Sequence, residues 1–214
     1  DFIDKRIDMK NINQTIITFN YETLFEHALL HKHIFGIYSY GLDIDKNKII
    51  NFPSYEESYK GNFLLLKLHG SLNWACCPSC DKNYLTWHNM YDRIISEKCK
   101  DCNNNLEPVL IPPTRNKILP ARLKKLWDIA QEKITSADEV TIIGSSFNDY
   151  DIDASDLIFN SLKSNKRKPI LCIADPCALD RGNLLNFRAS ATRDHFKNIM
   201  LFKGFREYLD NKTF

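Results

Sequence analysis

Four cysteines with regular spacing carry the clearest chemistry in this sequence. They form two C-x2-C pairs, Cys77 with Cys80 and Cys99 with Cys102, and 18 residues separate the pairs. Such spacing is typical of a zinc site in which each pair supplies two thiolates and the four sulfurs form a tetrahedron around the ion. Cys76 is a rival ligand, although Cys77 gives the regular spacing. Free thiols that bind no metal are the alternative interpretation.

A zinc ion with four thiolate ligands has no open position for water or substrate, so we expect it to be structural. The surrounding segment, 74–106, is rich in cysteine, asparagine, lysine and aromatic residues and has no long apolar run. Such a segment can hardly form a hydrophobic core unaided, and metal binding would supply its folding energy. We therefore predict a small zinc-ribbon insert at 74–106, with residues 1–73 and 107–214 forming the main domain.

Polar residues that stand directly after short apolar segments form a second set of candidates. Asn20 follows the segment QTIITF, and His69 follows the segment FLLLKL. Histidine exchanges a proton near neutral pH, and an asparagine amide can hold a hydroxyl group or a water without adding charge. The alternatives are a packed core histidine and an asparagine that caps the helix expected after it.

Two later apolar segments end in a similar way. The segment EVTII is followed by Gly144, Ser145 and Ser146, and the segment ILCIA is followed by Asp175. A glycine and two serines can form a loop that approaches a ligand closely, but they can also form a simple turn from a strand into a helix. Asp175 precedes a proline, so it too can belong to an ordinary turn.

These candidates need secondary structure elements that position them. Short, mostly apolar segments indicate buried strands, and they occur at 14–19, 63–68, 139–144, 170–175 and 198–202. Apolar residues at helical spacing indicate helices at 21–30, 121–134, 151–162 and 205–211. Strands that alternate with helices predict an α/β fold with a mostly parallel, doubly wound sheet.

In such sheets ligands bind at the carboxyl ends of the strands, where the connecting loops gather. Asn20, His69, Gly144 and Asp175 each stand just past the end of an expected strand. We therefore expect these four residues, with Ser145 and Ser146 after Gly144, to lie along one rim of the sheet.

Composition excludes several other classes of protein. The chain has 214 residues, enough for one large domain or one domain with an insert, and a formal net charge of +2. A charge so near zero argues against a nucleic-acid partner, including one bound by a zinc ribbon, and against an acidic membrane surface. Seven cysteines without a secretory segment favour metal ligands or free thiols in a reducing cytoplasm. Only seven glycines occur, and they form neither a G-x-G-x-x-G motif nor a P-loop.

In this order, the motifs resemble the sirtuin-like family. IITFNYETLFEHA is similar to the family's strand and Thr-x-Asn turn, and LKLHGSLNW is similar to its histidine-glycine segment. The two cysteine pairs stand where the family has its zinc ribbon. ADEVTIIGSSFNDYD is similar to its late Gly-x-Ser nucleotide loop, and ILCIADP is similar to the strand that follows. The forms FNYETL, KLHGSLNW and IIGSSFNDYD look most like the bacterial branch that degrades NAD in antiphage defence.

The resemblance implies a Rossmann-like NAD-binding domain with helices on both faces of the sheet and a structural zinc module. It implies that Asn20 positions the nicotinamide ribose and a water and that His69 is the catalytic histidine. It also implies roles in NAD binding for a further set of residues, which comprises Glu22, Gly144, Ser145, Ser146 and Asp175.

Three departures from the family pattern carry information. Glu22 replaces an aspartate, and Phe19 replaces a glutamine found in the deacylating branch. The segment PVLIPPT lacks the Phe-Gly-Glu pattern beside the peptide cleft of deacylating sirtuins. The family's N-terminal glycine-rich strand and turn, which would hold the pyrophosphate, is not visible in this chain. We expect either the later part of a longer chain or a relative with impaired NAD binding.

The sequence thus predicts a domain that hydrolyses NAD to ADP-ribose and nicotinamide, with NAD as its small-molecule partner. The alternatives are an NAD-dependent protein deacylase and a non-catalytic module for nucleotide binding or assembly. Further partners would be other domains of a longer chain or other copies of this one.

Overall fold

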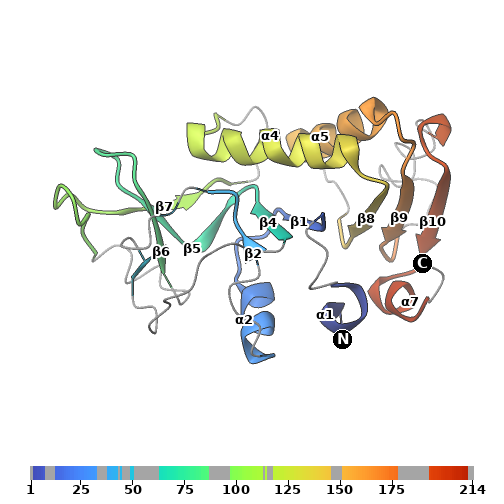
Figure 1. Ribbon diagram of the computed structural model, residues 1–214, viewed down its shortest axis with the longest axis horizontal. Coiled ribbons are helices and arrows are strands. Elements are labelled where there is room, and N and C mark those ends of the chain that lie inside the picture. The colour runs from blue at the N-terminus through green and yellow to red at the C-terminus, as the bar shows by residue number, and fades with distance from the viewer. Residues whose placement is uncertain are drawn as a thin grey trace. The chain divides into compact units, whose positions relative to one another are not determined.

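The computed structural model describes residues 2–7, 13–32, 38–42, 44, 49–50, 63–86, 97–112, 114, 118–145, 151–177 and 193–211. The chain divides into two compact units. Unit 1 comprises Asp1–Ile7, Pro113–Ile118 and Trp127–Phe214, and unit 2 comprises Asp8–Pro112 and Leu119–Leu126. Figure 1 labels their helices and strands.

Unit 2 begins with a three-stranded parallel sheet. Its order is β1-β4-β2, where β1 is Thr15–Thr18, β4 is Phe63–Lys67 and β2 is Tyr38–Ser39. Helix α2, Leu24–His31, follows β1. Phe63, Leu65 and Leu66 of β4 are almost wholly buried, as expected for a parallel strand covered on both faces, and Leu64 is half-buried.

A second sheet in unit 2 carries the zinc-ribbon segment. Its order is β3-β6-β5-β7, with bounds Ile49–Ile50, Asn83–Thr86, Gly70–Cys76 and Glu107–Leu110. Strand β5 pairs antiparallel with both β6 and β7, whereas β3 pairs parallel with β6. The sequence analysis expects no strands here. These strands are short, and a small core that contains two of the cysteines supports them: Ala75, Cys77, Tyr84, Cys99 and Leu106.

Unit 1 contains another parallel sheet, of order β10-β9-β8. Strand β8 is Glu139–Ile143, β9 is Ile170–Ala174 and β10 is Asn198–Phe202. Helix α5, Ile152–Ser164, lies in the connection from β8 to β9, and the short helix η2, Arg193–His195, precedes β10. Helix α4, Ala121–Ser136, leads into β8.

Helices cover the sheet of unit 1 on more than one side. Cys172 and Ala174 of β9 pack in one cluster with Phe202 and with Tyr208 of α7, Phe205–Asp210. The alternate residues of β9 point to the other face and are also fully buried. Figure 1 shows α5 above these strands, with α1, Phe2–Arg6, and α7 below them.

Helix α1 is an element that the sequence analysis does not predict, because five residues are too few to show a helical period. Arg6 fixes it to α7. The guanidinium lies 4.2 Å from the centre of the Tyr208 ring and donates a hydrogen bond of 2.8 Å to the backbone oxygen of Asn211. A cation over an aromatic face is a favourable contact that links the two ends of unit 1.

The expected α/β architecture with parallel sheets and helices is confirmed. The expected division into a main domain and an insert at 74–106 stays a prediction. Among the described residues, the helices are all too short or too polar to cross a membrane.

Candidate functional site

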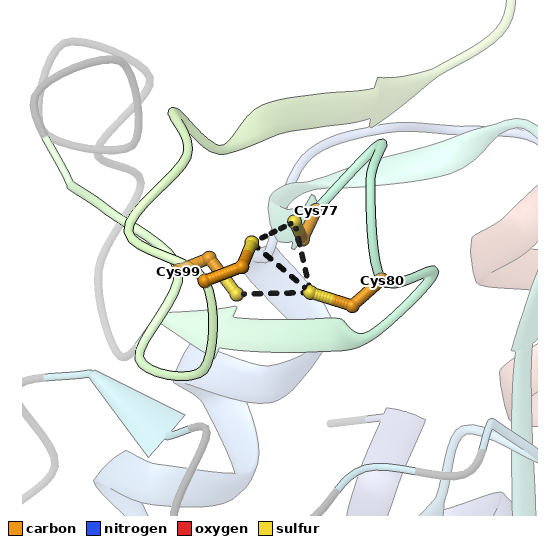
Figure 2. A group of neighbouring side chains, drawn as sticks. Cys77, Cys80 and Cys99 are labelled. Carbon is orange, nitrogen blue, oxygen red and sulfur yellow. Dashed lines mark hydrogen bonds between the residues drawn. The ribbon is translucent and has the colours of Figure 1, made fainter.

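The four cysteines of the two C-x2-C pairs come together in unit 2. Their Sγ atoms all lie within 4.8 Å of one another. Cys80 is the centre of the group, at 3.4 Å from Cys77, 3.4 Å from Cys99 and 3.2 Å from Cys102. Figure 2 shows Cys77 and Cys80, from one turn, pointing toward Cys99, from another. A zinc ion bound at 2.3 Å by each sulfur would set the sulfurs about 3.8 Å apart, so the donor set and its spacing fit zinc.

The two cysteine pairs stand on two separate turns of the same kind. The N–H of Asp81 donates to the Cys77 oxygen at 2.9 Å, and the N–H of Asn103 donates to the Cys99 oxygen at 2.9 Å. Asp81 and Asn103 directly follow the second cysteine of each pair, and both adopt a positive φ, of 54° and 59°. Asparagine and aspartate tolerate this left-handed conformation better than other non-glycine residues. The sequence therefore closes each turn with a suitable residue.

Hydrogen bonds inside the cluster give the thiols different acidities. The Tyr84 hydroxyl, 3.2 Å from the Cys99 sulfur, lowers the pKa of Cys99 to about 6. The Lys100 N–H donates to the same hydroxyl at 2.8 Å, which leaves the hydroxyl proton to point at sulfur. Close contacts with Cys102 and the other two thiols raise the pKa of Cys80 in the metal-free cluster. Zinc would hold all four groups as thiolates.

Cys76, the rival ligand, lies outside this group of four. Its side chain is half-buried, and burial raises the pKa of its thiol.

Asn20 and His69 lie at neighbouring strand ends. Strands β1 and β4 are parallel, with Thr18 opposite Lys67. Asn20 stands two residues after Thr18, and His69 stands two residues after Lys67. The His69 ring lies 5.3 Å from the ring centre of Phe19 and 6.1 Å from that of Tyr21. The histidine therefore packs against the two residues that flank Asn20 in the sequence.

The structure excludes one alternative interpretation, a helix-capping Asn20, and agrees with the other, a packed core His69. Helix α2 begins at Leu24 with Thr23 at its N-cap, so Asn20 does not cap it. Asn20 is exposed, and its side-chain amide donates to Glu22 Oε1 at 3.3 Å. His69 is only 2% exposed, as a packed core histidine would be.

The backbone around His69 is fixed by close approach of β7. Gly70 has φ of +86°, and a Cβ atom added to it would lie 1.9 Å from the Val109 oxygen. Only glycine fits there. One residue past β7, the Ile111 N–H donates to the His69 oxygen at 2.9 Å, and the Ile111 oxygen accepts from the Tyr21 hydroxyl at 2.6 Å. Ile111 therefore ties together the segments that carry Asn20 and His69.

The later candidates lie in unit 1. Gly144 and Asp175 each follow the paired residues Ile143 and Ala174, and the Gly144 N–H donates to the Ala174 oxygen at 3.0 Å. Gly144 has φ of +61° and open space around it. The Asp175 carboxylate accepts the Cys177 N–H at 2.8 Å, which is the turn role that the sequence allows.

The structure thus brings together the candidates Asn20, Glu22 and His69 in unit 2, and separately Gly144 and Asp175 in unit 1. Ser145 follows Gly144 and is half-buried, whereas Ser146 lies outside the described residues. The expectation that one rim carries Asn20, His69, Gly144, Ser145, Ser146 and Asp175 stays a prediction.

Sequence reasoning missed a buried polar network next to Asn20 and His69. Lys67 is 1% exposed although it ends the strand β4. Its ammonium lies 2.9 Å from the Glu26 carboxylate, which is also nearly buried. A lysine inside the apolar segment FLLLKL is the signal that could have found this network.

Comparison with known proteins gives the family. The family model described as "SIR2-like domain" matches residues 14–188, which is most of the chain. None of the curated proteins compared with it matches.

Solved Sir2 structures are also similar to this chain, at low identity. A Sir2 enzyme solved to explain mechanism and regulation is 19% identical, with 69% of this chain and 50% of that one covered and a TM-score of 0.39. A Sir2 complex with an inhibitor, 2'-O-acetyl-ADP-ribose and a deacetylated p53 peptide is 16% identical, with 98% and 74% covered and a TM-score of 0.42.

An ADP-ribose complex of a Sir2 homologue is 20% identical, with 62% of this chain and 52% of that one covered and a TM-score of 0.38. The chain spans about half the length of the first Sir2 chains that it matches. The family assignment rests on the domain match over residues 14–188, and this chain belongs to the SIR2-like domain family.

Proposed function

We propose that this protein hydrolyses NAD to ADP-ribose and nicotinamide, with Asn20 and His69 as its catalytic residues. One observation carries the proposal. The ends of β1 and β4 set these two residues on neighbouring strands, and the His69 ring packs on Phe19 and Tyr21, which flank Asn20. Membership of the SIR2-like domain family supports NAD as the substrate.

The reaction needs few groups. The bond between C1′ of the ribose and the nicotinamide nitrogen breaks, and nicotinamide leaves as a neutral molecule with the bonding electron pair. Water adds to C1′ and gives up a proton. Asn20, which is exposed, would orient the ribose and this water through its amide, and His69 would accept the proton. Because His69 is 2% exposed, substrate must reach it along the Asn20 side of the strand end or after a local opening.

The zinc site would have a different task. Cys77, Cys80, Cys99 and Cys102 would hold a structural ion that stabilises the turns around it. Four thiolates leave no coordination position for NAD or water, so the catalytic residues act without it.

Nicotinamide release, followed by chromatography on the full chain, tests the proposal. We expect His69→Ala and Asn20→Ala each to lower the rate about 100-fold or more, the usual scale for lost acid–base or positioning groups. His195→Ala and Asn160→Ala are matched controls, because both side chains are exposed in unit 1. Equal rates for wild type, His69→Ala and Asn20→Ala would refute the assignment.

A protein deacylase is the second candidate, because deacylating sirtuins use the same pair of residues. The segment PVLIPPT, which forms β7 and its continuation, argues against it because it lacks the expected peptide-cleft pattern. Nicotinamide release that depends on an added acetylated peptide would favour the deacylase. Release with NAD alone favours the hydrolase. If neither substrate is turned over and calorimetry detects no NAD or ADP-ribose binding, the domain is a non-catalytic module.

We further propose that NAD hydrolysis serves bacterial antiphage defence in the cytoplasm, with activity controlled by other domains or further copies of the chain. The support is the resemblance of FNYETL, KLHGSLNW and IIGSSFNDYD to that branch of the family. Bacteria that express the intact protein should lose NAD after phage infection, and those that express His69→Ala should not. NAD levels that stay equal in the two strains would contradict this role.

A further inference from the structure

A buried charged network joins the segments that carry Asn20 and His69. Lys67 ends β4, two residues before His69, and it is 1% exposed. Its ammonium donates to the Glu22 backbone oxygen at 2.5 Å and to Glu26 Oε1 at 2.9 Å. One cation thus binds both the loop after Asn20 and the first turn of α2.

Removing an ammonium and a carboxylate from water is unfavourable unless each finds good partners. An apolar residue would fill the β4 position without that penalty, as its neighbours Leu65 and Leu66 do. The position of Lys67 in the strand therefore needs a reason other than stability of the core, and its contact with the Glu22 carbonyl supplies one.

Glu26 has a second buried partner. The Tyr40 hydroxyl donates to Glu26 Oε1 at 3.0 Å, and burial, followed by the nearby Tyr38 and Glu26, raises the pKa of Tyr40 well above its usual value. Tyr40 therefore keeps its proton and acts as a donor. The Asn73 amide donates to the same hydroxyl at 3.3 Å.

From Asn73 the network returns to the loop where it began. The Asn73 Oδ1 atom accepts from the Ser71 hydroxyl at 2.6 Å, and that hydroxyl also lies 3.2 Å from the Tyr21 backbone oxygen. The Leu72 N–H donates to the same Tyr21 oxygen at 3.0 Å. The carbonyls of Tyr21 and Glu22, directly after Asn20, are therefore held from two sides.

We propose that Lys67 is a positioning residue, which fixes the loop of Asn20 beside His69 by binding the Glu22 carbonyl and Glu26 together. The role in catalysis rests on the NAD hydrolysis proposed above, whereas the fixing of the loop does not. Lys67 does not need to touch NAD.

A paired substitution tests this without leaving a lone buried charge. Lys67→Met removes the ammonium, and Glu26→Gln in the same chain removes the opposing charge while it leaves Tyr40 an acceptor. Replacement of a buried ion pair by neutral residues of similar volume is commonly tolerated, so we expect the double variant to fold. Lys125→Met, at an exposed position of α4, is the matched control.

Hydrogen exchange measured by mass spectrometry gives the first readout. We expect faster exchange of the amides at 20–24 in the double variant and unchanged exchange at 97–112, with the control like wild type. If the double variant does not fold, Lys67→Arg is measured instead, since it keeps the charge and changes the geometry at the Glu22 carbonyl. Unchanged exchange at 20–24 in the variant measured would overturn the proposal, and this readout requires no NAD hydrolysis.

Kinetics gives the second readout. Misplacement of a catalytic group by about 1 Å can lower a rate about 100-fold, so we expect kcat to fall about 10- to 100-fold with a smaller change in KM. In an Asn20→Ala background the same substitutions should change kcat less than about threefold, because the residue being positioned is gone. Equal losses in both backgrounds would show a general structural role and overturn the proposal. A wild type without nicotinamide release would refute the proposed function and leave the exchange result to decide on the loop.

Discussion

The hydroxyl of Tyr84 should contribute directly to zinc affinity. It lies 3.2 Å from the Cys99 sulfur and is almost wholly buried. Because the hydroxyl accepts the Lys100 N–H, its proton is directed at the sulfur, where it opposes the negative charge of a thiolate. Tyr84→Phe removes this one oxygen and leaves the ring in the small core beside Ala75 and Leu106.

The expected magnitude follows from the position of the hydroxyl. It hydrogen-bonds a ligand without touching the metal, and loss of such partners typically lowers metal affinity about 10- to 100-fold. It also lowers the pKa of Cys99 to about 6, so its loss should return that pKa toward the ordinary thiol value of 9.0. At pH 7 the variant would have to release an additional proton when zinc binds.

Competition with a chelator of known zinc affinity measures this change on the full chain. Tyr208→Phe is the matched control, since it removes a buried tyrosine hydroxyl in unit 1 that hydrogen-bonds the Thr141 hydroxyl and not a zinc ligand. We expect the control to bind zinc like wild type. Equal zinc affinity for Tyr84→Phe and wild type at pH 6, 7 and 8 would refute the reasoning that the hydroxyl supports the thiolate.

Three further predictions concern the same unit. Gly70→Ala should lower the free energy of unfolding, measured by denaturant titration, by about 3 kcal/mol or more, because backbone strain at a positive φ adds to a clash with the Val109 oxygen. Gly144→Ala should lower it by about 1–2 kcal/mol, because the new Cβ has backbone strain but no clash. Zinc affinity should fall as pH drops from 8, by about tenfold per pH unit for each proton that zinc displaces, because the raised pKa of Cys80 keeps this thiol protonated in the metal-free protein. Below about pH 6 the affinity should fall more steeply, because Cys99 also takes up a proton there. Removal of zinc with a chelator should speed hydrogen exchange in β5, β6 and β7, whereas β8, β9 and β10 of the other unit should keep their protection; loss of protection in all six strands would contradict a local structural role.

The sequence predicts the parallel strands well because their chemistry is local. Segments 63–68 and 170–175 are mostly apolar, and β4 and β9 end within one residue of their last residues. The segment 198–202 matches β10 in full. The helix expected at 21–30 instead begins at Leu24, because Thr23 takes the N-cap position. Helix boundaries depend on such cap geometry, which single residues do not reveal.

The antiparallel sheet and the buried network are not predictable in the same way. Strand β7 finds its partner β5 across the cysteine turns, and its residues alternate too briefly to show a period. The partners of Lys67 lie 41 and 45 residues away along the chain. Lysine is almost never fully buried, so composition alone argues for an exposed side chain here. The cysteine cluster is the exception, because two short turns fix its spacing locally.

Ile111 gives the zinc ribbon an influence beyond its own turns. The chain leaves the cysteine cluster through β7 and reaches Ile111, whose peptide groups bind the His69 oxygen and the Tyr21 hydroxyl. A tilt of β7 would therefore move the supports of both proposed catalytic residues at once. Any event that empties the cluster, such as oxidation of the thiols, would then be transmitted through one peptide as a change in geometry at the two strand ends. The metal content of the ribbon would in this way set the fraction of molecules that are competent for catalysis.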